Sequence, residues 1–589
     1  MRLWLASVIL TTLVAGPGGS CHIPSRQKAG KNATTGAASV VVINLHGSVT
    51  ETGDDGSLWS DARSLRKLLR TFRKARQSKK VDKVVLRIGR LSTGWAQITE
   101  LRKAVQLTRK AGKRVIAHLD DAGNREYFLA TAADEIVMSA SGSLWLVGVS
   151  AQAIFLRGLL DKVGIEAEFL HEGKYKGAAD ALTRKTMSPA MKEALGGILD
   201  NTYQTLVEAV AASRGMDPAR VKTLIDQAPL AAPQLKNLKL IDRIADHEDE
   251  TRRLAGTGSI NWTFGKKPKE QGTLRSLMEL FKPALLTRPP SSPHVALVYA
   301  EGQILYGPRR KGFGVSPHVA SHDIIRVLDK VRESEQVKAV VLRINSPGGS
   351  ALASDLIWNA VKRLAATKPV VVSMGDVAAS GGYYIAVPAT RVFAQPTTLT
   401  GSIGVIGGKF SLAGLMQKIG VSSETLTRGA RADIFNLTRS WTQAERQVIQ
   451  QYMHRTYKQF VDRVAQGRKL TPAAVEKVAQ GRIWSGRAAR EHKLVDQLGG
   501  LLDAVTEAKK LGKLASDAKT AVYPRPMTWI EKLQDTLGGA DARAQLTGAL
   551  LSELQGLPAQ RELRGVIQAL RAWQQERVLM WLPIIVTVQ

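Results

Sequence analysis

The chain has 589 residues, which is too long for one hydrophobic core and indicates two to four domains. Hydrophobic residues make up 44% of the chain and charged residues 23%, as in ordinary folded soluble proteins. The 83 lysines and arginines against 51 aspartates and glutamates give a formal charge of +32, which indicates either an anionic partner, membrane lipid first, or a solvated basic surface without a specific partner. No cluster of cysteines and histidines has the spacing of a zinc site, so we expect no metal.

The first twenty residues have the order of a secretory signal. Arg2 precedes an apolar run over residues 3–15, and residues 16–20 are glycine, proline and serine. A basic start, a short apolar core and small residues are typical of an export signal. The apolar run is too short to span a bilayer comfortably.

Cys21 is the single cysteine of the chain and follows these small residues directly, which excludes an internal disulfide. The arrangement resembles a bacterial lipoprotein signal, in which the cysteine carries the lipid, although Gly18 stands where leucine or valine is usual. Lipidation of Cys21 is the prediction, and plain cleavage or an uncleaved anchor are the alternatives. We predict a signal over 1–21 and a flexible tether over 22–39.

Apolar segments that alternate with helical ones follow the tether. The predicted strands cover 40–45, 84–88 and 115–118 in the first half and 295–299, 340–344 and 370–374 in the second. Long helices are predicted over 191–212 and 443–466. Continuous Val/Ile/Leu strands between helices favour an α/β fold with a parallel sheet that is covered on both faces.

An internal repeat relates the two halves. The segment 84–88 (VVLRI) recurs 256 residues later as VVLRI, and 127–130 (YFLA) recurs at the same offset as YYIA. Near the end of the repeat, 239–242 (KLID) pairs with 493–496 (KLVD) at an offset of 254. Such near-constant spacing indicates two homologous domains in tandem.

The repeat sets the predicted domain boundaries. These are a first repeat over 40–250, a connector over 251–293, a second repeat over 294–510 and a C-terminal extension over 511–589. The chain ends in an apolar run over 578–589. A docked strand is the favoured interpretation of this run, and a membrane-dipping segment or an oligomer contact are the alternatives.

Two loops of the second repeat carry residues suited to catalysis. The segment 345–350 (NSPGGS) follows a buried strand, and Gly348 and Gly349 leave backbone N–H groups open for an oxyanion. In 376–384 (DVAASGGYY), Ser380 stands among small residues at the start of a predicted helix, where the Gly381 N–H is nearby. Without further evidence, a tight strand-to-helix turn is the favoured interpretation of the first loop, and Ser380 is equally suited to a helix N-cap.

The order of these loops and of 400–405 (TGSIGV) resembles the signal peptide peptidase (SppA) family, in its long form with two repeats. The resemblance covers about residues 40–500 and implies two tandem spiral ββα domains of the Clp protease/crotonase type, with helical arms and a C-terminal extension. It implies Ser380 as nucleophile and oxyanion donors at Gly348, Gly349 and Gly381. It also implies a lysine base from the first repeat, with Ser402 orienting it.

The matching lysine segment is 173–179 (GKYKGAA), and the lysine after the tyrosine, Lys176, takes the role of base. Lys174 is the neighbour most easily confused with it. At the repeat offset, Ser380 falls on Asn124 and Lys176 falls on Ala432. Each repeat therefore lacks the group that the other retains, as expected after duplication of an ancestor that shared its sites between subunits.

The resemblance implies a membrane-associated serine endopeptidase that degrades cleaved signal peptides and other hydrophobic peptides without a cofactor. By family analogy we expect a homo-oligomer, a tetramer, at the periplasmic face of a bacterial cell membrane. The alternatives are an inactive membrane scaffold on the same fold, a crotonase-type acyl-CoA enzyme, and nucleic-acid binding. An export signal argues against CoA chemistry, and no nucleic-acid-binding motif accompanies the charge.

Overall fold

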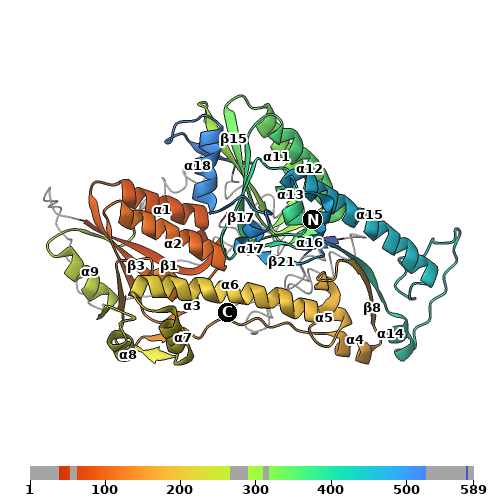
Figure 1. The fold of residues 1–589 in the computed structure, drawn as a ribbon, viewed down its shortest axis with the longest axis horizontal. Coiled ribbons are helices and arrows are strands. Elements are labelled where there is room, and N and C mark those ends of the chain that lie inside the picture. Colours follow the sequence, from red (N-terminus) through yellow and green to blue (C-terminus); the bar gives the residue numbers. More distant parts are fainter. Residues whose placement is uncertain (1–38, 53–62, 266–289, 310–316, 526–578, 582–589) are drawn as a thin grey trace, which may run out of the picture. The chain divides into compact units, whose positions relative to one another are not determined.

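The computed structural model describes residues 39–52, 63–265, 290–309, 317–525 and 579–581 (Figure 1). The predicted signal and Cys21 lie outside these residues, as do most of the connector and most of the C-terminal extension. The boundaries predicted for the tether, repeats, connector and extension stay predictions. The α/β class and the tandem organisation are confirmed.

The first repeat is built on a parallel sheet in the order β10-β6-β4-β3-β1-β11, with β2 also paired to β1. Its strands are β1 (Ser39–Thr50), β2 (Arg63–Ser64), β3 (Val81–Ser92), β4 (Arg114–Leu119), β6 (Glu135–Met138), β10 (Arg243–Ile244) and β11 (Ile260–Asn261). The three strands predicted for this half are confirmed as parts of β1, β3 and β4. β11 lies within the range predicted as connector.

Helices flank this sheet, and Figure 1 shows α1 and α2 side by side above β1 and β3. The helices of the first repeat are α1 (Leu65–Gln77), α2 (Trp95–Lys110), α3 (Asn124–Ala130), α4 (Arg157–Val163), α5 (Asp180–Thr183), α6 (Pro189–Arg214), α7 (Pro218–Asp226), α8 (Ala232–Asn237) and α9 (His247–Ala255). Helix α6 begins where the Ser188 side chain accepts the N–H of Met191, and it ends at Gly215, whose φ is 61°. The helix predicted over 191–212 is confirmed. A small sheet joins β5 (Ala122–Gly123), β7 (Ser143–Trp145) and β9 (Leu230–Ala231).

The second repeat has an eight-stranded sheet along the path β21-β19-β17-β15-β12-β23, with β18 also paired to β17 and β22 paired to β18. Its strands are β12 (His294–Glu301), β15 (Val337–Ser346), β17 (Val370–Ala379), β18 (Arg391–Ala394), β19 (Leu399–Gly401), β21 (Ile483–Ser485), β22 (Gln497–Leu498) and β23 (Thr520–Tyr523). Its helices are α11 (Ser321–Glu333), α12 (Ala351–Ala365), α13 (Gly381–Ala386), α14 (Ala413–Lys418), α15 (Gln443–Arg468), α16 (Pro472–Val478), α17 (Gly486–Glu491) and α18 (Leu501–Leu511). Strands predicted over 295–299, 340–344 and 370–374 are confirmed, as is the helix over 443–466.

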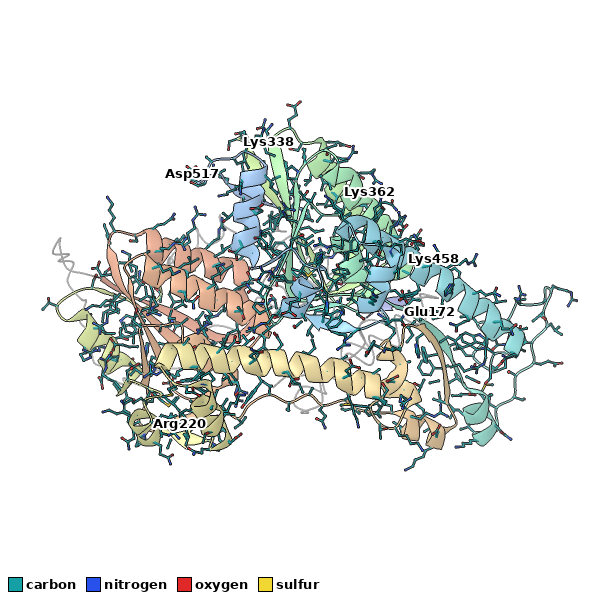
Figure 2. All side chains as sticks on the ribbon, in the orientation of Figure 1. Glu172, Arg220, Lys338, Lys362, Lys458 and Asp517 are labelled. Atoms are coloured by element: carbon teal, nitrogen blue, oxygen red, sulfur yellow. The ribbon has the colours of Figure 1, made fainter. Side chains whose placement is uncertain are left out.

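A third large sheet joins the two repeats, in the order β14-β13-β16-β24-β20-β8. It contains β8 (Glu166–Glu172), β13 (Gln303–Leu305), β14 (His318–Ala320), β16 (Gly348–Ser350), β20 (Val405–Ser411) and β24 (Leu579–Trp581). β8 of the first repeat pairs antiparallel with β20 of the second along its whole length. Glu172, labelled in Figure 2, ends β8 and accepts a hydrogen bond from Gln450 of α15 at 2.5 Å. The first repeat therefore reaches into the second by strand pairing.

A buried ion cluster also links the repeats. The Arg343 guanidinium of β15 lies 2.8 Å from a carboxylate oxygen of Glu51 and 2.7 Å from one of Glu100, and all three side chains are almost fully buried. Burial alone would lower the pKa of Arg343, but the two carboxylates outweigh it and raise that pKa. Burial raises the pKa of Glu100 to about 7. The cluster holds the second sheet against β1 and α2 of the first repeat.

Candidate active site

Ser380 stands on a sharp turn between β17 and α13. Its φ of 54° lies in the left-handed region, which is uncommon for a residue other than glycine. The turn is held because the Ser380 N–H donates to the carbonyl of Gly401 at 2.8 Å. Gly382 permits the close approach of β15, since a Cβ there would lie 2.6 Å from the Ser346 carbonyl oxygen. Strain at such a turn presents one hydroxyl in a fixed direction.

The Ser380 hydroxyl does not cap α13, although an N-cap was the alternative interpretation of this residue. It contacts the amine of Lys176 instead, with 2.8 Å between Oγ and Nζ. Both side chains are buried, and Lys176 comes from the first repeat. The structure therefore brings together the two residues that the family resemblance selected, from positions 204 apart in the chain.

The Lys176 backbone is held by a loop of the second repeat. The N–H of Tyr175 donates to the carbonyl of Gln480 at 2.8 Å, and the Lys176 N–H donates to Gly173 at 3.0 Å. Gly481 permits this contact, because a Cβ there would lie 2.6 Å from the Lys176 Cβ. Lys174 differs, since it is exposed and its amine lies over the Tyr175 ring. Lys176, not Lys174, reaches the serine.

Ser402 supplies two more contacts to the same amine. Its carbonyl oxygen lies 3.0 Å and its hydroxyl 2.9 Å from the Lys176 Nζ. The Ser402 backbone is fixed in turn by its N–H, which donates to the carbonyl of Arg482 at 2.8 Å, and its φ is 50°. Three oxygens at hydrogen-bond distance fix the position of the amine.

Burial lowers the pKa of Lys176 well below its usual value. A neutral amine has two N–H groups and one lone pair, so it can meet three oxygens only by accepting one hydrogen bond. The Ser402 carbonyl can only accept, so the accepted proton comes from a serine hydroxyl. This arrangement lets the lone pair of Lys176 face the Ser380 hydroxyl, as a general base requires.

The glycines of the candidate oxyanion loop form β16. Gly348 and Gly349 have φ of 99° and 155°, which side-chain-bearing residues rarely adopt. A Cβ at Gly349 would lie 2.0 Å from the Ile304 carbonyl oxygen, so the close approach of β13 excludes any other residue. The Gly348 N–H donates to the Ser346 hydroxyl at 3.2 Å.

The first repeat has no counterpart of this arrangement. Asn124, which aligns with Ser380, begins α3, and its side-chain amide donates to the Gly148 carbonyl at 2.7 Å. Ala432, which aligns with Lys176, is exposed. The described part of the chain thus contains one nucleophile-and-base pair of this kind, built from both repeats.

Sequence reasoning missed two elements around the pair. The carbonyl of Gln480 accepts from the N–H of Tyr175, next to Lys176, and the carbonyl of Arg482 accepts from the N–H of Ser402. Carbonyl contacts have no sequence signal because every residue has a carbonyl. The backbone contacts that position Lys176 and Ser402 could therefore not be predicted from the sequence.

The comparisons with known proteins identify the family. The model of Peptidase family S49 matches this chain twice, over residues 108–260 and 362–515. The chain belongs to peptidase family S49. The two matches confirm the tandem repeat and, with the relatives below, show that the chain is a serine protease.

Several relatives are similar over most of the chain. The "Serine protease SPPA, chloroplastic" of Arabidopsis thaliana is 35% identical over 85% of this chain and 73% of its own length. "Protease 4" of Salmonella typhi is 32% identical over 83% of this chain and 78% of its own length. The "Putative signal peptide peptidase SppA" of Enterococcus faecium is 39% identical over 39% of this chain and 64% of its own. The resemblance to the long SppA form is confirmed.

Proposed function

We propose that this S49 protease cleaves hydrophobic peptides, including cleaved signal peptides, with Ser380 as nucleophile and Lys176 as general base. The observation that carries the proposal is the 2.8 Å contact between the two side chains in a buried site. A lysine in such a site serves as a base because its neutral form is favoured there.

The proposed reaction has two stages. The Ser380 Oγ attacks the peptide carbonyl while its proton passes to the Lys176 amine, and the new oxyanion accepts hydrogen bonds from the backbone N–H groups of Gly349 and Gly381. The Gly348 N–H donates to the Ser346 hydroxyl, so its place in the loop positions the neighbouring Gly349. The protonated lysine then gives its proton to the leaving amine. Water, deprotonated by Lys176, hydrolyses the acyl-enzyme and frees Ser380. Ser402 holds the amine in line throughout.

Hydrophobic substrates and a membrane location are supported by the sequence. The export signal and Cys21 favour a chain held at the periplasmic face of a bacterial cell membrane, and the net charge of +32 is suited to anionic lipid. Lys338, Lys362 and Lys458, labelled in Figure 2, are exposed on the second repeat. No helix among the described residues is long and apolar enough to cross a bilayer.

Self-association is supported by exposed apolar side chains in both repeats. Val147 and Leu159 of the first repeat are more than half exposed, and so is Ile419 of the second. Leu426 is 89% exposed. Exposed apolar side chains can serve as contacts between subunits, so we propose a homo-oligomer, a tetramer by analogy with the family.

The test compares two substrates of equal length. A synthetic signal peptide in vesicles with anionic lipid and a polar peptide in solution are incubated with the full chain and with Ser380→Ala. The proposal expects faster loss of the signal peptide with the parent chain and no loss of either with the variant. Equal rates for the two peptides would refute the substrate class, and loss of peptide with Ser380→Ala would refute the nucleophile.

A further inference from the structure

The short C-terminal strand β24 lies beside the candidate catalytic groups. It pairs antiparallel with β16, with Gly348 opposite Trp581, Gly349 opposite Met580 and Ser350 opposite Leu579. On its other edge it pairs antiparallel with β20, with Ile406 opposite Leu579. A strand predicted at the chain's end is thus confirmed over 579–581, and it fills the space between two strands of the second repeat.

The elements on both sides of β24 are those that carry the active site. β16 holds the candidate oxyanion glycines, and β20 begins three residues after Ser402. Helix α13, which begins directly after Ser380, also contacts β24. A chain segment in this position therefore lies close to Ser380, to the oxyanion loop and to Ser402, which contacts the Lys176 amine.

Proteases commonly bind substrates as extended strands, because backbone hydrogen bonds to a sheet edge hold any sequence in register. Neighbouring strands lie about 4.8 Å apart, so β16 and β20 on either side of β24 leave room for one strand. A peptide that reaches Ser380 along β16 would have to occupy the place of β24. The two cannot bind together.

We propose that residues 579–581 are an internal peptide ligand of the substrate groove, which an incoming peptide must displace. This rests on the proposed function, since it assumes that Ser380 acts on peptides. The sequence of β24, Leu-Met-Trp, is apolar like the proposed substrates. A tethered ligand has an effective concentration of about a millimolar, so even weak pairing competes with dilute peptides.

The consequence is a site that favours peptides at high local concentration over dilute soluble peptides. If β24 occupies the groove nine times in ten, the apparent KM for a peptide rises roughly tenfold, because only the open fraction binds substrate. A peptide presented at high local concentration, such as one held in the same membrane, displaces β24 more readily than a dilute soluble peptide.

The test replaces one residue of the strand in the full chain. Met580→Pro removes an N–H and fixes φ, which excludes pairing on both edges, whereas Met580→Leu keeps the backbone and serves as the matched control. Hydrolysis of a hydrophobic peptide is followed for the parent and both variants. We expect a KM lower by roughly tenfold for Met580→Pro, with kcat not reduced, and parental values for Met580→Leu.

A chain truncated after residue 578 gives an independent measurement if the proline variant folds poorly. It should show the same lower KM, and a synthetic peptide of residues 576–584 should inhibit it competitively. Equal KM for the parent, Met580→Pro and the truncated chain would overturn the internal ligand while leaving the protease intact.

Failure of the proposed function has a different signature, namely no hydrolysis by any variant. Binding then decides the matter without turnover. In a Ser380→Ala background, fluorescence polarisation of a labelled peptide should show tighter binding when Met580→Pro is added. Unchanged affinity would overturn the proposal whatever the catalytic role of Ser380.

Discussion

Lys176→Met separates the charge of the buried lysine from its volume. The lysine side chain is 2% exposed, and methionine has nearly its length without an ionisable group. If the folded protein holds Lys176 neutral, folding at neutral pH must release a proton that the unfolded chain keeps, since a free lysine has a pKa of about 10.4. That release opposes folding, and the methionine variant avoids it.

The sign and magnitude follow from the lowered pKa. Between the folded pKa of Lys176 and about 10.4, the unfolded chain binds one more proton, so the free energy of unfolding rises with pH by about 1.36 kcal/mol per unit. Lys176→Met lacks this dependence. The variant also loses the hydrogen bonds to Ser380 and Ser402, which costs about 1–3 kcal/mol at every pH. The test is therefore how the difference in free energy of unfolding changes with pH, not its size at one pH.

The assay is urea unfolding of parent and variant, followed by tryptophan fluorescence, at several values between about pH 7 and about pH 9. We expect the stability of the parent relative to Lys176→Met to grow by about 1.4 kcal/mol for each pH unit in this window. A difference that stays constant with pH would show that Lys176 keeps its proton in the folded state. The general-base argument would then fail.

Three further changes test the surroundings of the pair. Ser402→Ala should lower kcat by roughly 10–100-fold and shift the pH profile of kcat/KM, because the amine loses one holder, and steady-state kinetics against pH measures both. Gly349→Ala should abolish hydrolysis of a peptide ester, since its Cβ would collide with β13. Arg343→Met should cost about 3–5 kcal/mol in urea unfolding by leaving two buried carboxylates unpaired, whereas the exposed inter-repeat pair lost in Arg487→Met should cost under about 1 kcal/mol.

The tandem fold was predictable because its signals are local and repeated. Each central strand is a continuous apolar run, and the same runs recur at one offset, so class and organisation followed from the pattern. The candidate pair was predictable only through family motifs. Lys176 is buried and Lys174 is exposed, but the residue type does not show which of two nearby lysines is buried. Without the family motif, the sequence gives no reason to assign the role of base to Lys176 rather than to Lys174.

The contacts between the repeats could not be predicted, for physical reasons. Arg343 lies within an apolar strand and looks like a solvent-facing residue, yet it is fully buried because Glu51 and Glu100 of the other repeat neutralise it. A docked strand was predicted for 578–589, but its pairing with β16 and β20 within the second repeat was not, because a strand of three residues is defined by its partners rather than by its own sequence. Such features depend on long-range pairing, which local patterns do not encode.

The central claim is that Ser380 of one repeat and Lys176 of the other form a single catalytic pair. Hydrolysis of a hydrophobic peptide ester by the full chain, measured beside Ser380→Ala, Lys176→Ala and Lys174→Ala, tests it most directly. The account predicts activity in the parent and in Lys174→Ala, and loss of roughly 10³-fold or more in the other two. Full activity in Ser380→Ala or in Lys176→Ala would contradict it.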